Sequence, residues 1–152
     1  MSIDDEIKLT DFGWSIHVAE SNKRRRTYCG TPDYICPEIA FQKDYDFNLD
    51  LWCLGVLTYE FAAGFAPFSD CYDRKDMLRK IKELEFECPE HFSEEIKHFI
   101  KSLMRTKPED RMSLEKAEKH PWIVKNYLEP MQKRLEEKEK KKHDNTQEDV
   151  EI

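Results

Sequence analysis

The sequence is poor in glycine and lacks a glycine-rich phosphate-binding loop. Its four glycines, among 152 residues, stand at positions 13, 30, 55 and 64 and form no G-x-G-x-x-G pattern. An excess of positive charge is also lacking, because 25 Lys and Arg face 32 Asp and Glu, giving a net charge of −7. Direct binding to nucleic acid or to anionic membranes depends on such an excess. The composition therefore predicts neither activity.

Paired cysteines and long apolar runs are lacking as well. The five cysteines form no C-x-x-C pair and no zinc-like spacing with histidine, and an odd number cannot all pair within one chain. We therefore expect reduced thiols. The first residues are acidic, without the apolar stretch of a signal peptide, and no apolar run approaches the ~20 residues that span a bilayer. These absences predict a soluble protein of the cytoplasm or nucleus.

The distribution of apolar residues predicts one packed domain over residues 1–124 and a charged tail over residues 125–152. From Met131 onward, Leu135 is almost the only apolar residue before Val150. Such a composition is typical of a solvated helix that frays into a disordered tail. A nuclear-import role for the basic run Lys140 to Lys142 is an alternative to a plain solvated tail.

Four helices are predicted by apolar spacing and by the residues at their ends. The central one, residues 50–63, is apolar on nearly every side, with Asp50 at its start and Gly64 just past its end. The other three are predicted around the apolar residues 77–84, after an N-cap at Ser93, and from Ser113 to near His120-Pro121-Trp122.

The residues before the central helix predict a short strand and then a long loop. Ile7-Lys8-Leu9-Thr10 alternates apolar and polar residues, which favours a strand that ends at Asp11-Phe12-Gly13. Residues 14–48 show no sustained helical period and contain Gly30, Pro32 and Pro37. Ordered loops of this length are uncommon and usually functional.

Two short motifs in this region carry groups suited to phosphate chemistry. The Asp11 carboxylate is a hard oxygen ligand of the kind that Mg²⁺ prefers, and Gly13 would permit a sharp turn after Phe12. The alternative to metal binding is that Asp11-Phe12-Gly13 is only a turn that follows a strand. Arg24-Arg25-Arg26 precedes Thr27, so phosphorylation of Thr27 would create Arg–phosphate pairs that order the loop. The alternative is an unmodified, solvated basic loop.

Further motifs follow at consistent spacing, and the whole set resembles a protein Ser/Thr kinase over residues 7–124. They are Gly30-Thr31-Pro32-Asp33-Tyr34, Cys36-Pro37-Glu38, Asp50-x-Trp52-x-x-Gly55 and His120-Pro121-Trp122. Trp14-Ser15 after Asp-Phe-Gly, and Cys-Gly-Thr-x-Asp-Tyr downstream, are similar to the Aurora kinases of mitosis. The sequence departs from that family at Pro32, where Leu or Met is usual, and at Cys36, where Pro is usual.

The resemblance implies a mainly α fold: the C-terminal lobe of a kinase, with a short N-terminal β-hairpin remnant and a long activation loop. It implies metal binding by Asp11, phosphorylation at Thr27 and substrate docking by Gly30, Thr31, Pro32, Asp33 and Tyr34. Structural roles are implied for a Glu38–Arg111 ion pair and for Asp50, Trp52 and Gly55. In that family the aspartate at the position of Asp50 ties down the catalytic loop.

The resemblance also implies ATP and Mg²⁺ as cofactors, protein substrates and kinase regulators as partners, and a location that includes the spindle or centrosome. Kinases carry their Gly-rich loop, phosphate-binding lysine and His-Arg-Asp loop before Asp-Phe-Gly, and only ten residues precede Asp11. We therefore expect Met1 to be an internal methionine of a longer kinase. We expect the chain alone to be inactive, to bind ATP and Mg²⁺ weakly or not at all, and to expose apolar faces of its central helix. The alternative function is a non-catalytic fragment that binds substrates or regulators through residues 30–38.

Overall fold

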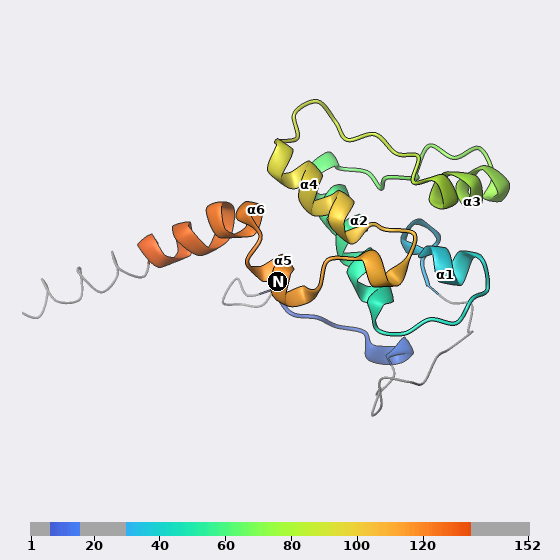
Figure 1. Ribbon diagram of the computed structural model, residues 1–152, viewed down its shortest axis with the longest axis horizontal. Helices are drawn as coiled ribbons and strands as arrows, with labels where there is room; N and C mark the ends of the chain where they lie inside the picture. The colour runs from blue at the N-terminus through green and yellow to red at the C-terminus, as the bar shows by residue number, and fades with distance from the viewer. Residues whose placement is uncertain (1–6, 16–29, 135–152) are drawn as a thin grey trace, which may run out of the picture.

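The computed structural model describes residues 7–15 and 30–134, which fold into helices joined by loops (Figure 1). The larger helices are α2 (Asn48–Ala63), α3 (Arg74–Glu83) and α4 (Glu94–Leu103). The shorter α-helices are α1 (Pro37–Ala40), α5 (Leu114–Glu118) and α6 (Pro121–Ile123). The elements η1 (Phe12–Trp14), η2 (Pro32–Tyr34) and η3 (Pro108–Asp110) are single turns of 3₁₀-helix. The element η4 (Val124–Leu128) is a π-helix.

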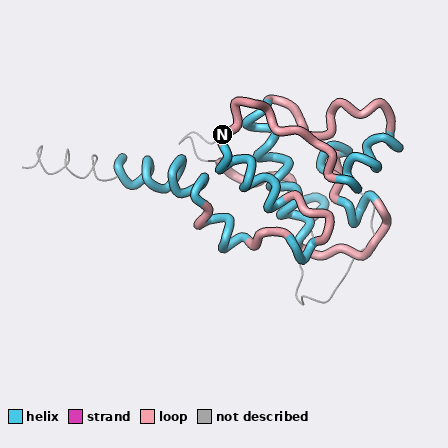
Figure 2. The backbone as a smooth tube through the Cα atoms, turned by 45° about the horizontal axis from the view of Figure 1, so that its top comes forward, coloured by secondary structure: helices cyan, strands magenta, loops and turns pink. Residues whose placement is uncertain are grey.

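The mainly α fold is confirmed, and the predicted hairpin remnant is not seen in the residues that the structure describes. Within residues 7–15 and 30–134 the chain forms helices and loops but no β-strand (Figure 2). Ile7 and Leu9 are 85 % and 86 % exposed. A strand is stabilised by hydrogen bonds to a neighbouring strand, and no segment in the described part of the chain supplies one. Alternation of apolar and polar residues is therefore not sufficient here.

Helix α2 runs through the middle of the molecule and ends where the sequence predicts. Gly64 adopts a left-handed conformation with φ of 84°, and its N–H donates to the Glu60 carbonyl at 2.8 Å. This conformation favours glycine, because it has no Cβ to clash. The helix begins two residues before Asp50, at Asn48, whose N–H donates to Asp46 Oδ1 at 2.9 Å. The N-cap, Phe47, makes no side-chain cap, so the Asp46 carboxylate accepts from the first N–H of the helix instead.

Helix α4 packs closely against α2. As predicted, Ser93 caps α4, because its Oγ accepts a hydrogen bond from the Ile96 N–H at 3.4 Å. Gly55 permits the close approach, since a Cβ on it would lie 2.6 Å from Met104 Cγ and 3.1 Å from Leu103 Cβ. The glycine is therefore required for space, and not for a special backbone angle.

The core consists of two clusters that share α2 and α4. The larger one includes Trp52 and Val56 of α2, and Trp52 stacks on Phe68 with ring centroids 6.2 Å apart. The smaller one contains Phe99 and Leu103 of α4 with Ala117 of α5. Both clusters consist of buried hydrophobic residues, so they supply the hydrophobic stabilisation of the fold.

One face of α2 is less well covered. Phe61 is 78 % exposed, and the half-buried Leu54 and Leu57 lie beside it. These side chains and Trp122 line an open hollow of about 370 Å³. The expectation of exposed apolar faces is thus confirmed for Phe61 but not for Trp52, which is completely buried.

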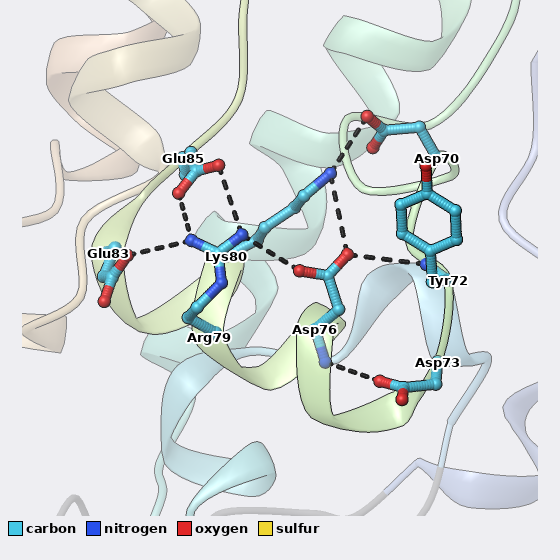
Figure 3. Close-up of polar contacts among 8 residues, drawn as sticks. All are labelled: Asp70, Tyr72, Asp73, Asp76, Arg79, Lys80, Glu83 and Glu85. Atoms are coloured by element: carbon cyan, nitrogen blue, oxygen red, sulfur yellow. Dashed lines mark hydrogen bonds and ion pairs between the residues drawn. The ribbon is translucent and has the colours of Figure 1, made fainter.

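Helix α3 is held by a network of exposed polar contacts (Figure 3). Asp73 caps its first turn, because Asp73 Oδ1 accepts from the Asp76 N–H at 2.8 Å. Arg79 pairs with Asp76 at 2.9 Å, with Glu83 at 3.1 Å and also with Glu85. Exposed pairs of this kind contribute little each, so the apolar side chains of α3 still decide its packing.

The C-terminal helices form an arm that projects from the rest of the molecule (Figure 1). Helix α6 begins at Pro121, and helical structure continues through η4 to residue 134, the last residue that the structure describes. Most of the predicted tail lies outside the described residues. None of the helices in the described ranges is long and apolar enough to cross a membrane.

Candidate functional site

The predicted substrate-docking segment, residues 30–38, is exposed at its start and buried at its end. Gly30 has a φ of 116°, a conformation that favours glycine. Gly30, Thr31 and Pro32 are exposed, Asp33 and Tyr34 are half-buried, and every residue from 35 to 40 is buried. The segment therefore presents its first residues to solvent while its other end is anchored in the core.

A buried ion pair makes this anchor. Glu38 and Arg111, which are 3 % and 6 % exposed, form two parallel hydrogen bonds of 2.6 Å each. The Arg111 guanidinium also donates to the Asn48 carbonyl at 2.8 Å and to the Arg105 carbonyl at 3.1 Å. Its carbon lies 5.6 Å from the centre of the Trp52 ring. Arg111 thus ties α1, the start of α2 and the loop after α4 to one point.

A second contact holds the segment against α2. The Tyr34 hydroxyl donates to Glu60 Oε2 at 2.5 Å, and the Cys53 thiol approaches the Tyr34 carbonyl at 3.7 Å. Burial, followed by the bond to Glu60, raises the pKa of Tyr34 to about 12. Glu60 was not predicted as a functional residue, although it is a lone acidic residue in an otherwise apolar stretch.

Two cysteines lie around this anchor, Cys36, which is buried, and Cys53, which is half-buried. Burial raises the pKa of Cys36 to about 12 and that of Cys53 to about 11. Both are free, and a thiol with a raised pKa is a poor nucleophile because it stays protonated. Their place is in the packing between residues 34–40 and α2.

The residues predicted at the start of α2 lie on different sides of it. Trp52 is buried against Arg111, and Gly55 lies against α4. Asp50 is exposed, its pKa is raised by partial desolvation, and its carboxylate makes no hydrogen bond or ion pair with the described residues. The buried Trp52 Nε1 also lacks a hydrogen-bond partner within the described part of the chain. Among the described residues, Trp52 Nε1 is thus the buried side-chain polar atom without a partner, whereas the exposed Asp50 carboxylate faces solvent.

Asp11 is placed on an exposed turn and is not joined to the anchor. It adopts the left-handed conformation with φ of 61°, and its carboxylate accepts from the Gly13 N–H at 3.3 Å. The sequence predicts a sharp turn at Gly13, but the residue with the left-handed backbone is Asp11. No group of three His, Cys, Asp or Glu gathers in residues 7–15 or 30–134. One carboxylate does not fit the octahedral demand of Mg²⁺ by itself.

Thr27, the predicted phosphorylation site, lies outside the described residues together with its preceding arginines. The structure places the exposed residues that follow it, from Gly30 to Pro32. Its modification therefore stays a prediction.

These features agree with the comparison of the chain with known families. The protein kinase domain family matches residues 1–123, which is most of the chain. The chain belongs to the protein kinase family. Glu38, helix α2 and Arg111 therefore belong to a segment of a kinase domain.

Within that family the chain is similar to Aurora kinases. It is 46 % identical over 125 residues to the Aurora kinase of Schizosaccharomyces pombe, covering 82 % of this chain and 35 % of that protein. It is 43 % identical over 128 residues to Aurora kinase A-B of Xenopus laevis, covering 84 % and 31 %. Aurora kinase C of Mus musculus is 39 % identical over 123 residues, covering 81 % and 44 %. The chain thus spans between about a third and somewhat under half of these relatives.

Proposed function

We propose that this chain is the substrate-docking part of an Aurora-like protein serine/threonine kinase with a role in cell division. The observation that carries the proposal is the anchored segment itself. Gly30 to Pro32 face solvent, while the buried Glu38–Arg111 pair and the Tyr34–Glu60 bond fix the backbone on either side of Cys36. A segment fixed in this way can present a peptide without a large ordering cost.

The kinase family implies ATP and Mg²⁺. When bound, Mg-ATP would supply the γ-phosphoryl group for transfer to a serine or threonine hydroxyl, with ADP and a proton released. The chain's own contribution is to hold the peptide carrying that hydroxyl along residues 30–34. Asp11 would give one oxygen to the metal, so we expect weak or no binding of ATP and Mg²⁺ by this chain alone.

Thr27 would act as the switch of the docking segment. Its phosphate would add about −1.5 to −2 charges beside Arg24, Arg25 and Arg26. Arg–phosphate pairs would then order the chain that leads into Gly30. The expected result is tighter peptide binding by the phosphorylated chain.

A non-catalytic binding role is the second candidate. It is favoured by the isolation of the Asp11 carboxylate, which no described residue joins in a metal site. In this role the chain would bind substrates or regulators of a kinase through residues 30–38 and compete with it. Both functions predict peptide binding, so binding alone does not separate them.

A peptide-binding measurement tests the shared part of the proposal. The probe is a fluorescein-labelled peptide with two arginines before a serine, and fluorescence anisotropy reports its binding to the full chain. Asp33→Lys should weaken binding, because it places a positive charge in the docking segment. Glu118→Lys, the same charge change on the exposed surface of α5, should leave binding unchanged. Equal effects of the two variants would contradict docking at residues 30–34.

A chimera separates the two candidates. The chain alone should incorporate no phosphate from radiolabelled ATP, and turnover above background would show that the inactivity prediction is wrong. Joining the chain to the part of the S. pombe Aurora kinase that precedes its Asp-Phe-Gly motif should give an active kinase, and Asp11→Ala should abolish that activity. A folded chimera that stays inactive would favour the binding fragment.

A further inference from the structure

A groove lies where the ends of α1 and α3 meet, apart from the docking segment. Its volume is about 290 Å³, near the lower end of ligand-binding pockets. The lining is mostly apolar and consists of Pro37, Phe41, Lys43, Lys82 and Thr106. Helices α1 and α3 pack against each other at this edge of the molecule (Figure 1). The groove therefore has walls from three separate parts of the chain.

A residue in the left-handed conformation follows each of the two helices that border the groove. Gln42, directly after Phe41, has a φ of 53°, and Leu84, the C-cap of α3, has a φ of 52°. They are two of the three non-glycine residues with positive φ in the described part of the chain. Both residues close the helices that precede them, because the Lys43 N–H donates to the Glu38 carbonyl at 2.8 Å and the Glu85 N–H to the Lys80 carbonyl at 2.9 Å. These closing turns set where the chain leaves α1 and α3 at the groove.

The groove also carries two positive charges without partners. Lys43 and Lys82 are exposed, and within residues 7–15 and 30–134 neither ammonium group makes a hydrogen bond or ion pair. By contrast, Arg79 and Lys80 on the same helix are paired with carboxylates (Figure 3). The end of α3 favours a cation such as Lys82. It does not account for Lys43, which follows a helix of only four residues.

We propose that this groove binds a short acidic peptide segment of a partner protein, with one aromatic or aliphatic side chain lying against Phe41 and Pro37. Carboxylates on either side of that side chain would meet Lys43 and Lys82. Two lysines whose ammonium groups have no partner among the described residues, placed beside an apolar groove, complement a segment in which carboxylates flank one apolar side chain. This site goes beyond the proposed function and is independent of it, because the docking segment takes basic peptides.

The experiment uses a fluorescein-labelled probe with a central phenylalanine and three glutamates on each side. Its binding to the full chain is measured by fluorescence anisotropy. The double variant Lys43→Glu with Lys82→Glu should weaken binding by about tenfold or more, because two attractions become repulsions. The matched control is Lys75→Glu, an exposed lysine in the first turn of the same helix, and binding should be unchanged. A probe with alanine in place of phenylalanine should also bind more weakly.

Each result decides the question. Unchanged affinity of the double variant, or an equal loss with Lys75→Glu, would overturn the site. Equal binding of the phenylalanine and alanine probes would reduce it to unspecific charge attraction and would also overturn it. Circular dichroism of each variant verifies that the helices are retained. Self-association in sedimentation velocity that the double variant abolishes would assign the groove to a second copy of the chain. Failure here leaves the basic-peptide measurement at residues 30–34 unaffected.

Discussion

Arg111 shows how one charged residue can organise a fold. Its guanidinium satisfies one carboxylate and two backbone carbonyls, and it lies over the face of Trp52. Taking two charges out of water is costly, so the geometry must be good for the pair to be tolerated. The two parallel 2.6 Å bonds to Glu38 meet that demand. The pair therefore specifies where residues 30–38 lie, more than it adds stability.

Removing one member of this pair should be strongly destabilising. Arg111→Met leaves the Glu38 carboxylate buried without its partner, and we expect it to cost about 3–5 kcal/mol of unfolding free energy. The double variant Arg111→Met with Glu38→Leu should cost much less than the sum of the two single changes, because no charge is left buried. Urea unfolding followed by circular dichroism measures these values.

Arg79→Met is the control for the prediction on Arg111. Arg79 pairs with more carboxylates, Asp76, Glu83 and Glu85, but all of its pairs are at the surface. We expect a cost of less than about 1 kcal/mol. A cost as large as that of Arg111→Met would contradict the view that burial, and not the number of ion pairs, decides the effect.

At the scale of elements, the joint between α4 and α6 depends on two histidines that the sequence analysis did not single out. His120 caps α6, because its Nδ1 accepts from the Trp122 N–H at 3.2 Å. Its Nε2 therefore carries the proton and donates to His98 Nδ1 on α4 at 2.8 Å. The two rings are stacked, with centroids 5.1 Å apart. This arrangement requires a neutral His120 ring, because its Nδ1 accepts a hydrogen bond.

The joint should make the protein less stable in mild acid. Burial, and then the neighbouring His98, lowers the pKa of His120 below its ordinary value of 6.5. As the pH falls below about 6.5, His120 binds a proton more readily in the unfolded chain than in the folded chain. The contribution of His120 to the free energy of unfolding is therefore fully present above that pH and is lost below it. The urea midpoint should therefore be lower at about pH 5.5 than at about pH 7.5.

His120→Asn tests the origin of this pH dependence. Asparagine can still cap α6 but does not titrate, so the difference between the two urea midpoints should shrink. His91→Gln is the comparison, because His91 is exposed and its ring lies 3.3 Å from the Ala62 carbonyl. The prediction fails if His91→Gln shrinks the difference as much as His120→Asn does.

The elements that were predicted well have local signals. Gly64 marks the end of α2, and Ser93 marks the start of α4. The apolar residues 77–84 give α3 nearly its full length. The strand at residues 7–10 failed because a strand depends on a neighbour that local sequence does not reveal. The Tyr34–Glu60 and His98–His120 contacts were missed for the same reason, since each joins residues more than 20 positions apart.

At the scale of the whole molecule, α2 and α4 connect the two apolar clusters. Trp52 and Val56 of α2 lie in the larger cluster, while Leu51 and Leu54 pack against the smaller one. Helix α4 supplies Ile100 to the first and Phe99 to the second. The family resemblance predicted Gly55 as structural, and the structure supplies the reason. Because the glycine allows these two helices to touch, both clusters should melt together.

Gly55→Val should therefore lower the stability of the entire described fold. The added side chain would overlap Met104 Cγ and Leu103 Cβ, which forces α2 and α4 apart. Overpacking of this kind costs about 1–3 kcal/mol, or a fall in melting temperature of about 5–15 °C for a domain of this size. Far-ultraviolet circular dichroism and tryptophan fluorescence should report one common transition before and after the change.

The control is Phe61→Val, which introduces the same residue on the exposed side of α2 and should shift the transition far less. Two separate transitions would show that the clusters unfold independently and that α2 does not join them.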